Sequence, residues 1–296
     1  MRAHNQIASD FIGLFRRTFL SRRRFMTTSA AAAAGYTLAA GPVSAAAITT
    51  DAKGLITGTA TIETAEGPMP AYFAKPEGAV NPPVVIVAME VFGLHEYIKD
   101  VTRRLAKLGA FAVAPDYYFR LGDLTTVSDL QKLMPLVNSK ADSELVADLN
   151  ATVEWAKGQG GKTSKLGIIG FCRGGRTVWL YSATNPNLTA GVAFYGSLVD
   201  PASQKQLWPK SPIELAPVMK APVLGLYASE DTGIPPSQVE TMKAALAAAG
   251  KTAEFKIYPG VAHGFHADYR PSYNAEAAKD AWAQMTAWFK RWSVLP

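Results

Sequence analysis

Short apolar runs alternate along this chain with longer segments in which apolar residues recur every three or four positions. Most of the runs are almost continuously apolar, as in parallel strands whose two faces are both covered by helices. The alternation predicts an α/β fold with a mostly parallel sheet and helices on both faces. The predicted strands are residues 83–88, 110–114, 166–169, 191–195, 223–227 and 253–258, and the predicted helices are residues 96–108, 143–157, 175–183, 236–249 and 275–292.

A shorter pattern precedes this sheet. Residues 56–63 and 70–74 predict an antiparallel hairpin that leads into it. No stretch between residues 48 and 296 has the composition of an interdomain linker, so we predict a single domain over residues 48–296. Residues 121–141 fit neither pattern and leave room for a partial lid over the sheet.

The first 47 residues differ in composition from the rest of the chain. Paired arginines stand at positions 16–17 and in residues 21–26 (Ser-Arg-Arg-Arg-Phe-Met), an Ala-rich stretch follows, and residues 45–47 offer a cleavage site of the Ala-x-Ala kind. This order resembles a bacterial twin-arginine export signal, which a receptor reads as an address. The resemblance implies the twin-arginine export machinery as a partner and a periplasmic or secreted location for residues 48–296.

A transmembrane helix and a disordered basic tail are the alternative interpretations of residues 1–47. A membrane span needs about 20 strongly apolar residues, whereas Ala, Gly, Ser and Thr dominate here, so we expect no stable membrane insertion. Residues 1–47 also contain six arginines and one aspartate, which is +5 of the net charge of +6. The remaining domain is close to neutral, and its charge gives no reason to expect a nucleic-acid partner.

Cysteine occurs once, as Cys172 in residues 170–175 (Gly-Phe-Cys-Arg-Gly-Gly), directly after a predicted strand. A reactive residue between a strand and a Gly-rich helix start is the layout of a nucleophile elbow. The N–H groups at the start of the helix favour an anionic sulfur, and the thiolate is the nucleophilic form. The alternative is a small apolar core residue, which describes most free cysteines.

A nucleophile of this kind needs a base and an acid that orients it. His263 follows the last predicted strand, and Asp231 follows the strand before it. Because the carboxyl ends of parallel strands meet at one edge of the sheet, both side chains are expected near Cys172. The chain order nucleophile, acid, histidine is that of α/β-hydrolases, so we predict the α/β-hydrolase fold.

Four motifs together resemble the dienelactone hydrolase (carboxymethylenebutenolidase) family over about residues 55–293. They are residues 89–93 (Met-Glu-Val-Phe-Gly), 115–120 (Pro-Asp-Tyr-Tyr-Phe-Arg), 170–175 and 263–265 (His-Gly-Phe). The resemblance implies hydrolysis of a small lactone or carboxylic ester through a triad of Cys172, His263 and Asp231 and a cysteinyl acyl-enzyme. It also implies that Glu90, which spacing alone leaves equally open to being a solvated strand end, pairs with the resting thiol.

The resemblance further implies backbone N–H groups of Val91 and Arg173 as an oxyanion hole and Arg120 as a substrate-binding arginine; on spacing alone, Arg120 fits a surface residue equally well. The family's second substrate arginine would stand at Ala267, so Arg270 is the candidate to replace it. His95 and His266 are the remaining histidines of the domain and candidates to line the pocket.

Two other functions stay open from the residues alone. The first is that of a broad thiol esterase or thioesterase. The second is that of a non-catalytic protein whose exposed thiol senses oxidants. No Gly-rich phosphate loop opens a helix after the first predicted strand, and the histidines and the cysteine show no metal-ligand spacing. We therefore expect neither a nucleotide cofactor nor a metal.

Overall fold

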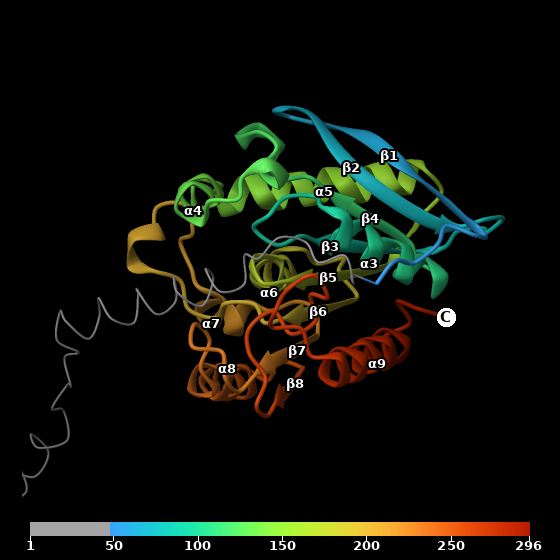
Figure 1. Ribbon diagram of the computed structural model, residues 1–296. Helices are drawn as coiled ribbons and strands as arrows, with labels where there is room; N and C mark the ends of the chain where they lie inside the picture. The colour runs from blue at the N-terminus through green and yellow to red at the C-terminus, as the bar shows by residue number, and fades with distance from the viewer. Residues whose placement is uncertain (1–47) are drawn as a thin grey trace, which may run out of the picture.

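An eight-stranded sheet forms the centre of the protein in the computed structural model, which describes residues 48–296 (Figure 1). The predicted export signal, residues 1–47, lies outside the described residues. The strand order is β1-β2-β4-β3-β5-β6-β7-β8. The strands are β1 (Leu55–Thr64), β2 (Gly67–Pro76), β3 (Pro83–Ala88), β4 (Phe111–Pro115), β5 (Lys162–Phe171), β6 (Ala190–Phe194), β7 (Val223–Ala228) and β8 (Ala253–Tyr258).

The sheet is antiparallel at one edge and parallel elsewhere. Strands β1 and β2 form the predicted hairpin, and β2 pairs antiparallel with β4. All pairs from β4 through β3, β5, β6 and β7 to β8 are parallel, so their carboxyl ends share one edge. The predicted α/β-hydrolase fold is confirmed, and this shared edge is where its ligands bind.

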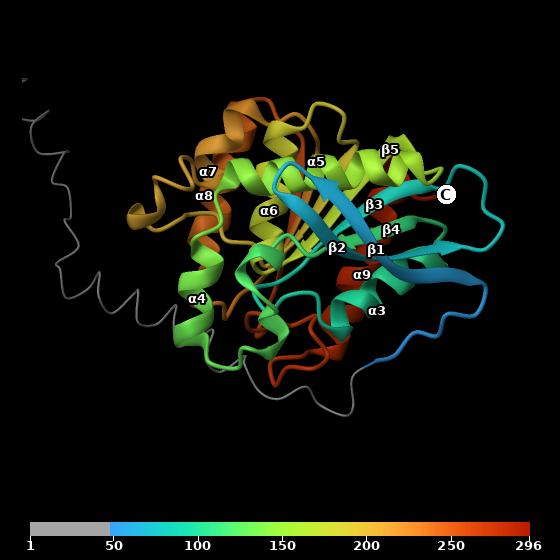
Figure 2. The ribbon, with the colours of Figure 1, turned by 90° about the horizontal axis from the view of Figure 1, so that it is seen from above.

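Helices cover both faces of the sheet (Figure 2). A Cβ on Gly167 of β5 would lie 2.5 Å from Val294, just beyond α9, while one on Gly191 of β6 would lie 2.7 Å from Val178 of α6, on the opposite face. One layer holds α3 (Glu96–Lys107) and α9 (Ala275–Arg291), and the other holds α5 (Asp142–Gly158), α6 (Arg173–Thr184) and α8 (Pro236–Ala248).

The segment that sequence left unassigned, residues 121–141, contains helix α4 (Leu130–Asn138) and the short turn η3 (Leu124–Thr126). Asp129 caps α4 by accepting a hydrogen bond from the N–H of Gln131 at 2.9 Å. The smaller elements η2 (Phe119–Leu121), η4 (Ala202–Gln204), α7 (Pro212–Leu215) and η5 (Ala216–Val218) are likewise too short to produce a periodic pattern.

The first described residues are fixed to the domain through their backbone. The N–H of Ile48 donates to the Asp268 carboxylate at 3.2 Å, and the carbonyl oxygen of Thr50 accepts from Arg103 at 2.8 Å. Asp268 belongs to the loop after β8, so this attachment joins the start of the domain to the loop that carries His263. Within residues 48–296, no helix combines the length and the apolar character that crossing a bilayer requires.

Candidate active site

Cys172 occupies the turn between β5 and α6, at the carboxyl edge of the sheet. Its φ of 55° lies in the region that side-chain-bearing residues adopt only at a cost in free energy. The strand and helix touch here: a Cβ on Gly170 would lie 2.1 Å from the carbonyl oxygen of Gly174, and one on Gly174 would lie 2.0 Å from that of Ala88. The turn that presents the thiol therefore requires these glycines, as a nucleophile elbow does.

His263 and Asp231 come from the loops after β8 and β7 and meet at the same edge. Nδ1 of His263 lies 2.6 Å from Oδ2 of Asp231. The other carboxylate oxygen accepts hydrogen bonds from the N–H groups of Gly233 at 3.0 Å and Ile234 at 3.1 Å. Burial raises the pKa of Asp231, but His263 and these N–H groups lower it by more, so the acid is ionised and holds the imidazole in one orientation.

Cys172 and His263 interact through a hydrogen bond and through their charges. Burial raises the pKa of the Cys172 thiol, but His263 and, to a smaller extent, Arg270 lower it, and the net shift is downward. Burial lowers the pKa of His263, and Asp231 and Cys172 reverse this and raise it to about 10. The opposite shifts favour a thiolate beside an imidazolium, which is the reactive state of a catalytic cysteine.

Glu90 lies just beyond β3 and is fully buried. Its carboxylate accepts a hydrogen bond from the Tyr269 hydroxyl at 2.5 Å and pairs with Arg270, whose Nη2 is 2.9 Å away. Nε2 of His95 lies 3.6 Å from the same carboxylate. Burial raises the pKa of Glu90, and Arg270, His95 and Tyr269 together lower it to about 2, so Glu90 is a buried anion.

The structure thus brings Cys172 to His263 and Glu90 to Arg270. The implied pairing of Glu90 with the resting thiol and the binding of substrate by Arg270 stay predictions. The side chain of Arg270 is 0% exposed. After burial and His263, Arg270 lowers and Glu90 raises the pKa of Cys172, so both act on the sulfur through their charges.

The predicted oxyanion donors, the N–H groups of Val91 and Arg173, directly follow Glu90 and Cys172 in the chain. Arg173 is the first residue of α6, so its N–H has no acceptor within the helix. Neither N–H donates to a backbone carbonyl of a loop or turn within residues 48–296. The role of these two groups in catalysis stays a prediction.

The segment of residues 121–141 touches both loops that carry these donors. The Arg173 guanidinium donates to Oδ1 of Asn138, at the end of α4, at 2.6 Å and lies 4.0 Å from the ring centroid of Trp208. A Cβ on Gly93, two residues after Val91, would lie 3.2 Å from Cβ of Leu124. Movement of residues 121–141 would therefore change the contacts of the two loops that carry the predicted oxyanion donors.

Arg120 lies in η2, after β4. Its guanidinium makes two hydrogen bonds to Asp148 of α5, at 2.9 and 3.0 Å, and one to Thr64 at 3.0 Å. These bonds tie the end of β1 to α5. The guanidinium must share or leave Asp148 to bind a substrate carboxylate, and the substrate-binding role of Arg120 stays a prediction.

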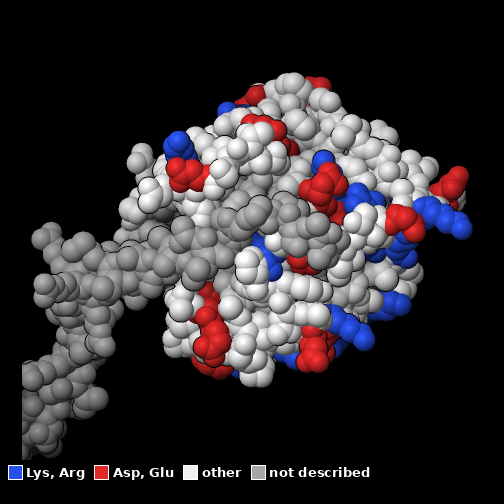
Figure 3. Space-filling view, in the orientation of Figure 1, with Lys and Arg blue, Asp and Glu red and all other residues white. Residues whose placement is uncertain are grey.

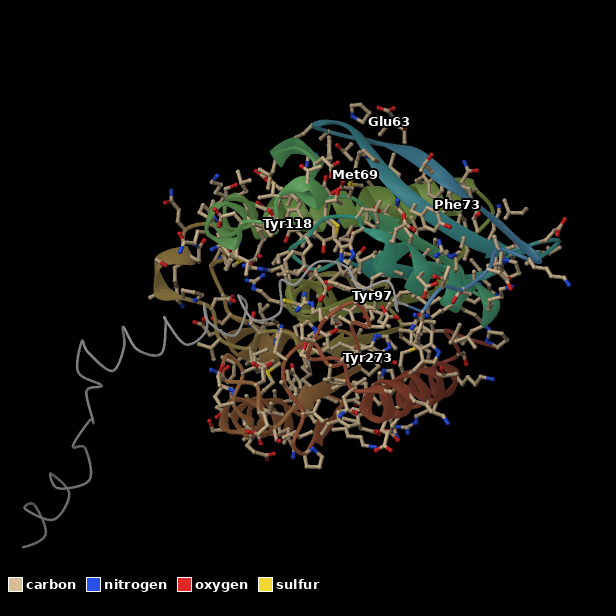
Figure 4. The ribbon with its side chains drawn as sticks, in the orientation of Figure 1. Glu63, Met69, Phe73, Tyr97, Tyr118 and Tyr273 are labelled. Atoms are coloured by element: carbon tan, nitrogen blue, oxygen red, sulfur yellow. The ribbon has the colours of Figure 1, made fainter. Side chains whose placement is uncertain are left out.

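Three tyrosines that contact these residues, Tyr269, Tyr195 and Tyr97, are not among the predicted site residues. Tyr269 bonds to Glu90, and Tyr195 follows β6 with its ring centroid 5.0 Å from that of His263. Tyr195 could have been found, because it ends a strand at the same edge as Cys172. The hydroxyl of Tyr97, the tyrosine labelled near the centre of Figure 4, lies 2.6 Å from Nδ1 of His266, whose place in the pocket stays a prediction.

A separate cavity of about 710 Å³ lies at the opposite edge of the sheet. It is lined by Thr163 and Ser164 at the start of β5, by Asn150 of α5 and by Asn185 after α6. Cys172 is at the other end of β5, so this cavity is not the candidate active site. Within the described residues, no group of three or more His, Cys, Asp or Glu side chains is arranged to hold a metal ion.

Lys and Arg side chains alternate with Asp and Glu around the described surface on the face shown in Figure 3. Ion pairs of the described residues include Lys107 with Asp51 at 2.6 Å and Lys205 with Glu214 at 2.8 Å. This mixed pattern is that of a solvated surface, and it differs from the single-sign surface typical of nucleic-acid binding.

Comparison with known proteins gives consistent results. Residues 69–293 match the Dienelactone hydrolase family. A candidate carboxymethylenebutenolidase of Methylorubrum extorquens is 49% identical over 289 residues, which cover 97% of this chain and 98% of that protein. Another, from Escherichia coli K12, is 45% identical over 260 residues, which cover 87% of this chain and 95% of that protein.

Solved structures show the same relationship. The crystal structure of a candidate dienelactone hydrolase from Klebsiella pneumoniae matches with a TM-score of 0.77 and 47% identity, covering 80% of this chain and 98% of that one. A dienelactone hydrolase-like promiscuous phosphotriesterase from metagenomic libraries matches with a TM-score of 0.67 and 23% identity, covering 80% of this chain and 98% of that one. At that identity the second likeness concerns the fold alone.

Proposed function

The chain belongs to the dienelactone hydrolase family and is an ester or lactone hydrolase, and we propose that it acts through Cys172, His263 and Asp231 by way of a cysteinyl acyl-enzyme. The observation that carries this proposal is the 2.6 Å contact between His263 and Asp231 at the edge where Cys172 stands. The downward pKa shift of Cys172, which burial opposes and His263 produces, supports its role as nucleophile.

In the first half of the reaction, the Cys172 thiolate attacks the carbonyl carbon of the substrate. The carbonyl electron pair moves to oxygen, and the N–H groups of Val91 and Arg173 stabilise this oxyanion, each contributing about 3 kcal/mol to the transition state. When the intermediate collapses, the bond to the leaving oxygen breaks and that oxygen takes the proton from Nε2 of His263. The products are the thioester and the free alcohol, which in a lactone remain joined.

In the second half, His263 takes a proton from water while the water oxygen attacks the thioester carbon. The new tetrahedral intermediate expels the Cys172 thiolate and releases the acid, and the imidazolium is again paired with the thiolate. Asp231 stays ionised throughout and stabilises the imidazolium in each half.

The experiment that tests this mechanism measures hydrolysis of nitrophenyl acetate and of a panel of lactones by the wild-type protein, Cys172→Ala and His263→Ala. Turnover is expected to be lost in both variants. Glu230→Gln is a matched control, because Glu230 is exposed and adjacent to Asp231, and it should keep wild-type turnover. Unchanged turnover in either the cysteine or the histidine variant would exclude the mechanism.

We propose that the substrate carries a carboxylate, which Arg120 binds in exchange for Asp148. Arg120→Ala is then expected to raise KM for anionic lactones and to leave KM for neutral esters unchanged. Lys140→Ala is the matched control, because Lys140 is the other cation on Asp148, at 2.7 Å. Equal effects of Arg120→Ala on anionic and neutral substrates would rule out this role.

We also propose that the protein is exported by a twin-arginine signal and works in the periplasm or outside the cell. Replacing Arg22 and Arg23 by lysine should leave the protein unprocessed in the cytoplasm, whereas the same change at Arg16 and Arg17 should not. Fractionation and mass determination of the N-terminus measure this. Periplasmic recovery of the Arg22 and Arg23 variant would contradict the proposal.

A further inference from the structure

Arg173 differs from the other described arginines in its electrostatic partners. Residues 48–296 contain seven arginines, and six of them form an ion pair with at least one Asp or Glu. These six are Arg103, Arg104, Arg120, Arg176, Arg270 and Arg291. Asp142 and Asp200 both bind Arg176, one turn further along α6, each at 2.7 Å. Arg173 is thus the one arginine of residues 48–296 whose guanidinium has no carboxylate of that part of the chain within ion-pair distance.

Uncharged groups nevertheless hold the Arg173 guanidinium in a defined place. Its Nη2 donates to Oδ1 of Asn138 at 2.6 Å, and its central carbon lies 4.0 Å from the ring centroid of Trp208. The indole of Trp208 is itself fixed by a 2.9 Å hydrogen bond to the carbonyl oxygen of Lys140. The other side-chain nitrogens of Arg173 are not enclosed in the protein, so they reach solvent. An arginine held by an amide and an aromatic face keeps its charge and is preorganised for an anion.

The Arg173 side chain starts next to the nucleophile. Arg173 directly follows Cys172 and is the first residue of α6. Because neighbouring Cα atoms are about 3.8 Å apart and an arginine side chain reaches about 6 Å to its central carbon, that carbon lies within about 10 Å of the Cα of Cys172. Burial raises the pKa of the Tyr118 phenol, labelled in Figure 4, and the charges of both Arg173 and Cys172 also act on it. The guanidinium and the nucleophile therefore belong to the same part of the carboxyl edge.

We infer that the Arg173 guanidinium binds a carboxylate on the acyl chain of the substrate. The inference rests on the proposed function, because it concerns the ester or lactone that Cys172 attacks. Arg173 can form this pair without breaking an existing ion pair, whereas Arg120 must share or leave Asp148. A carboxylate about 5 Å from the reacting carbonyl carbon, four bonds along an extended chain, falls within this reach. The substrate class is then an ester or lactone that carries an acidic group at that spacing.

The test compares two esters with acyl chains of equal length. The mono-nitrophenyl ester of glutaric acid ends in a carboxylate, and nitrophenyl pentanoate ends in a methyl group. The measured quantity is the ratio of kcat/KM for the anionic ester to kcat/KM for the neutral ester. An effect on the thiolate or on the backbone N–H of residue 173 enters both values and cancels. Arg173→Met is expected to lower the ratio about tenfold, and an unchanged ratio would overturn the proposal.

Two further variants separate the charge from the shape and the position of the side chain. Arg173→Lys keeps the charge and should retain a ratio above that of Arg173→Met. Arg291→Met removes the same charge at the end of α9, where Arg291 is exposed and paired with Glu254, and it should keep the wild-type ratio. An equal fall in Arg291→Met would show that the net charge of the protein alone selects the anionic ester, which would also overturn the proposal.

A variant of Asn138 tests the same charge with Arg173 in place. Asn138→Asp turns the amide that accepts from Arg173 into a carboxylate of nearly the same shape, so the guanidinium gains an ion-pair partner within the protein. The ratio should then fall as it does in Arg173→Met, even where that variant does not fold. Asn187→Asp adds the same charge at an exposed position on the opposite edge of the sheet and should keep the ratio. A wild-type ratio in Asn138→Asp, or an equal fall in Asn187→Asp, would contradict the proposal.

Binding without turnover separates this inference from the proposed function. Glutarate is titrated calorimetrically into Cys172→Ala, which retains the Arg173 side chain, and into the double variant with Arg173→Met. Binding is expected in the first protein and about tenfold weaker binding in the second. If the wild-type protein hydrolyses neither ester, the proposed function fails, and this titration still decides whether Arg173 binds the carboxylate. Equal affinities of the two proteins for glutarate, or no binding to either, would overturn the inference.

Discussion

Arg270 and Glu90 form an ion pair in which neither side chain is exposed to solvent. The Tyr269 hydroxyl is bonded to both, donating to Glu90 at 2.5 Å and accepting from Nε of Arg270 at 3.1 Å. Charges at this depth are stable only when each is compensated. The pair therefore joins the loop after β3, which carries Val91, to the loop after β8, which carries His263.

Breaking this pair on one side should be costly. Arg270→Met leaves Glu90 buried without its cation, and we expect the free energy of unfolding to fall by about 3–5 kcal/mol. Glu90→Gln leaves the opposite charge and should behave similarly. The double variant removes both charges and should be destabilised by less than the sum of the two. Denaturant unfolding of all four proteins measures this, and additive effects would show that the pair is not energetically coupled.

The ion pair of Glu90 and Arg270 should also make the free energy of unfolding depend on pH in the acid range. Folding lowers the pKa of Glu90 from the ordinary 4.5 to about 2. A group whose folded pKa is lowered stabilises the protein above its unfolded pKa, and this contribution disappears as pH falls through the window between the two values. Wild-type unfolding should therefore become easier from pH 4.5 toward pH 2, more steeply than unfolding of the Glu90→Gln and Arg270→Met double variant. Parallel pH profiles would contradict this assignment.

The nucleophile turn should tolerate no side chain at Gly174. A Cβ there would lie 2.0 Å from the carbonyl oxygen of Ala88, so Gly174→Ala must displace β3 or α6 and should cost several kcal/mol of stability, about 2 or more. Gly158→Ala, at the end of α5, meets nothing within 4 Å and should be neutral or stabilising by up to about 1 kcal/mol. Thermal unfolding of the two variants compares them directly, and equal midpoints would show that the turn can relax.

Asp231 is expected to affect kcat by orienting and stabilising the imidazole of His263. Asp231→Asn removes the charge that stabilises the imidazolium and is expected to lower kcat about 10²–10⁴-fold, with a smaller change in KM. The pH at which Cys172 ionises should rise as well, because His263 would be a weaker cation. Initial rates over a range of pH measure both effects. A variant with wild-type kcat would mean that another group orients His263.

The chain's hydrophobic pattern predicts the central sheet closely. Strands β3 and β8 have the predicted bounds of 83–88 and 253–258. Strand β5 begins at Lys162, earlier than predicted, because residues 162–165 are alternately exposed and partly buried and therefore form no apolar run. Burial on both faces is what makes a strand visible in sequence, and strand ends at the rim lack it.

The candidate site also has a part that the sequence predicts and a part that it does not. Cys172, His263 and Asp231 were expected together because each follows a parallel strand, and the structure brings them together. The Glu90 to Arg270 pair joins residues 180 positions apart. No local pattern carries such a pairing, since it depends on how two loops pack. The twin arginines and the lid role of residues 121–141 stay predictions.

The contact between Ile48 and Asp268 has a practical consequence for protein engineering. Asp268 stands two residues before Arg270, and its carboxylate also binds Arg104 at 2.9 Å. A tag or fusion partner joined directly ahead of Ile48 therefore attaches to a point that is hydrogen-bonded to the loop that carries His263. The residue at which an engineered version of this protein begins is thus a design choice that bears on the loop after β8 through this hydrogen bond.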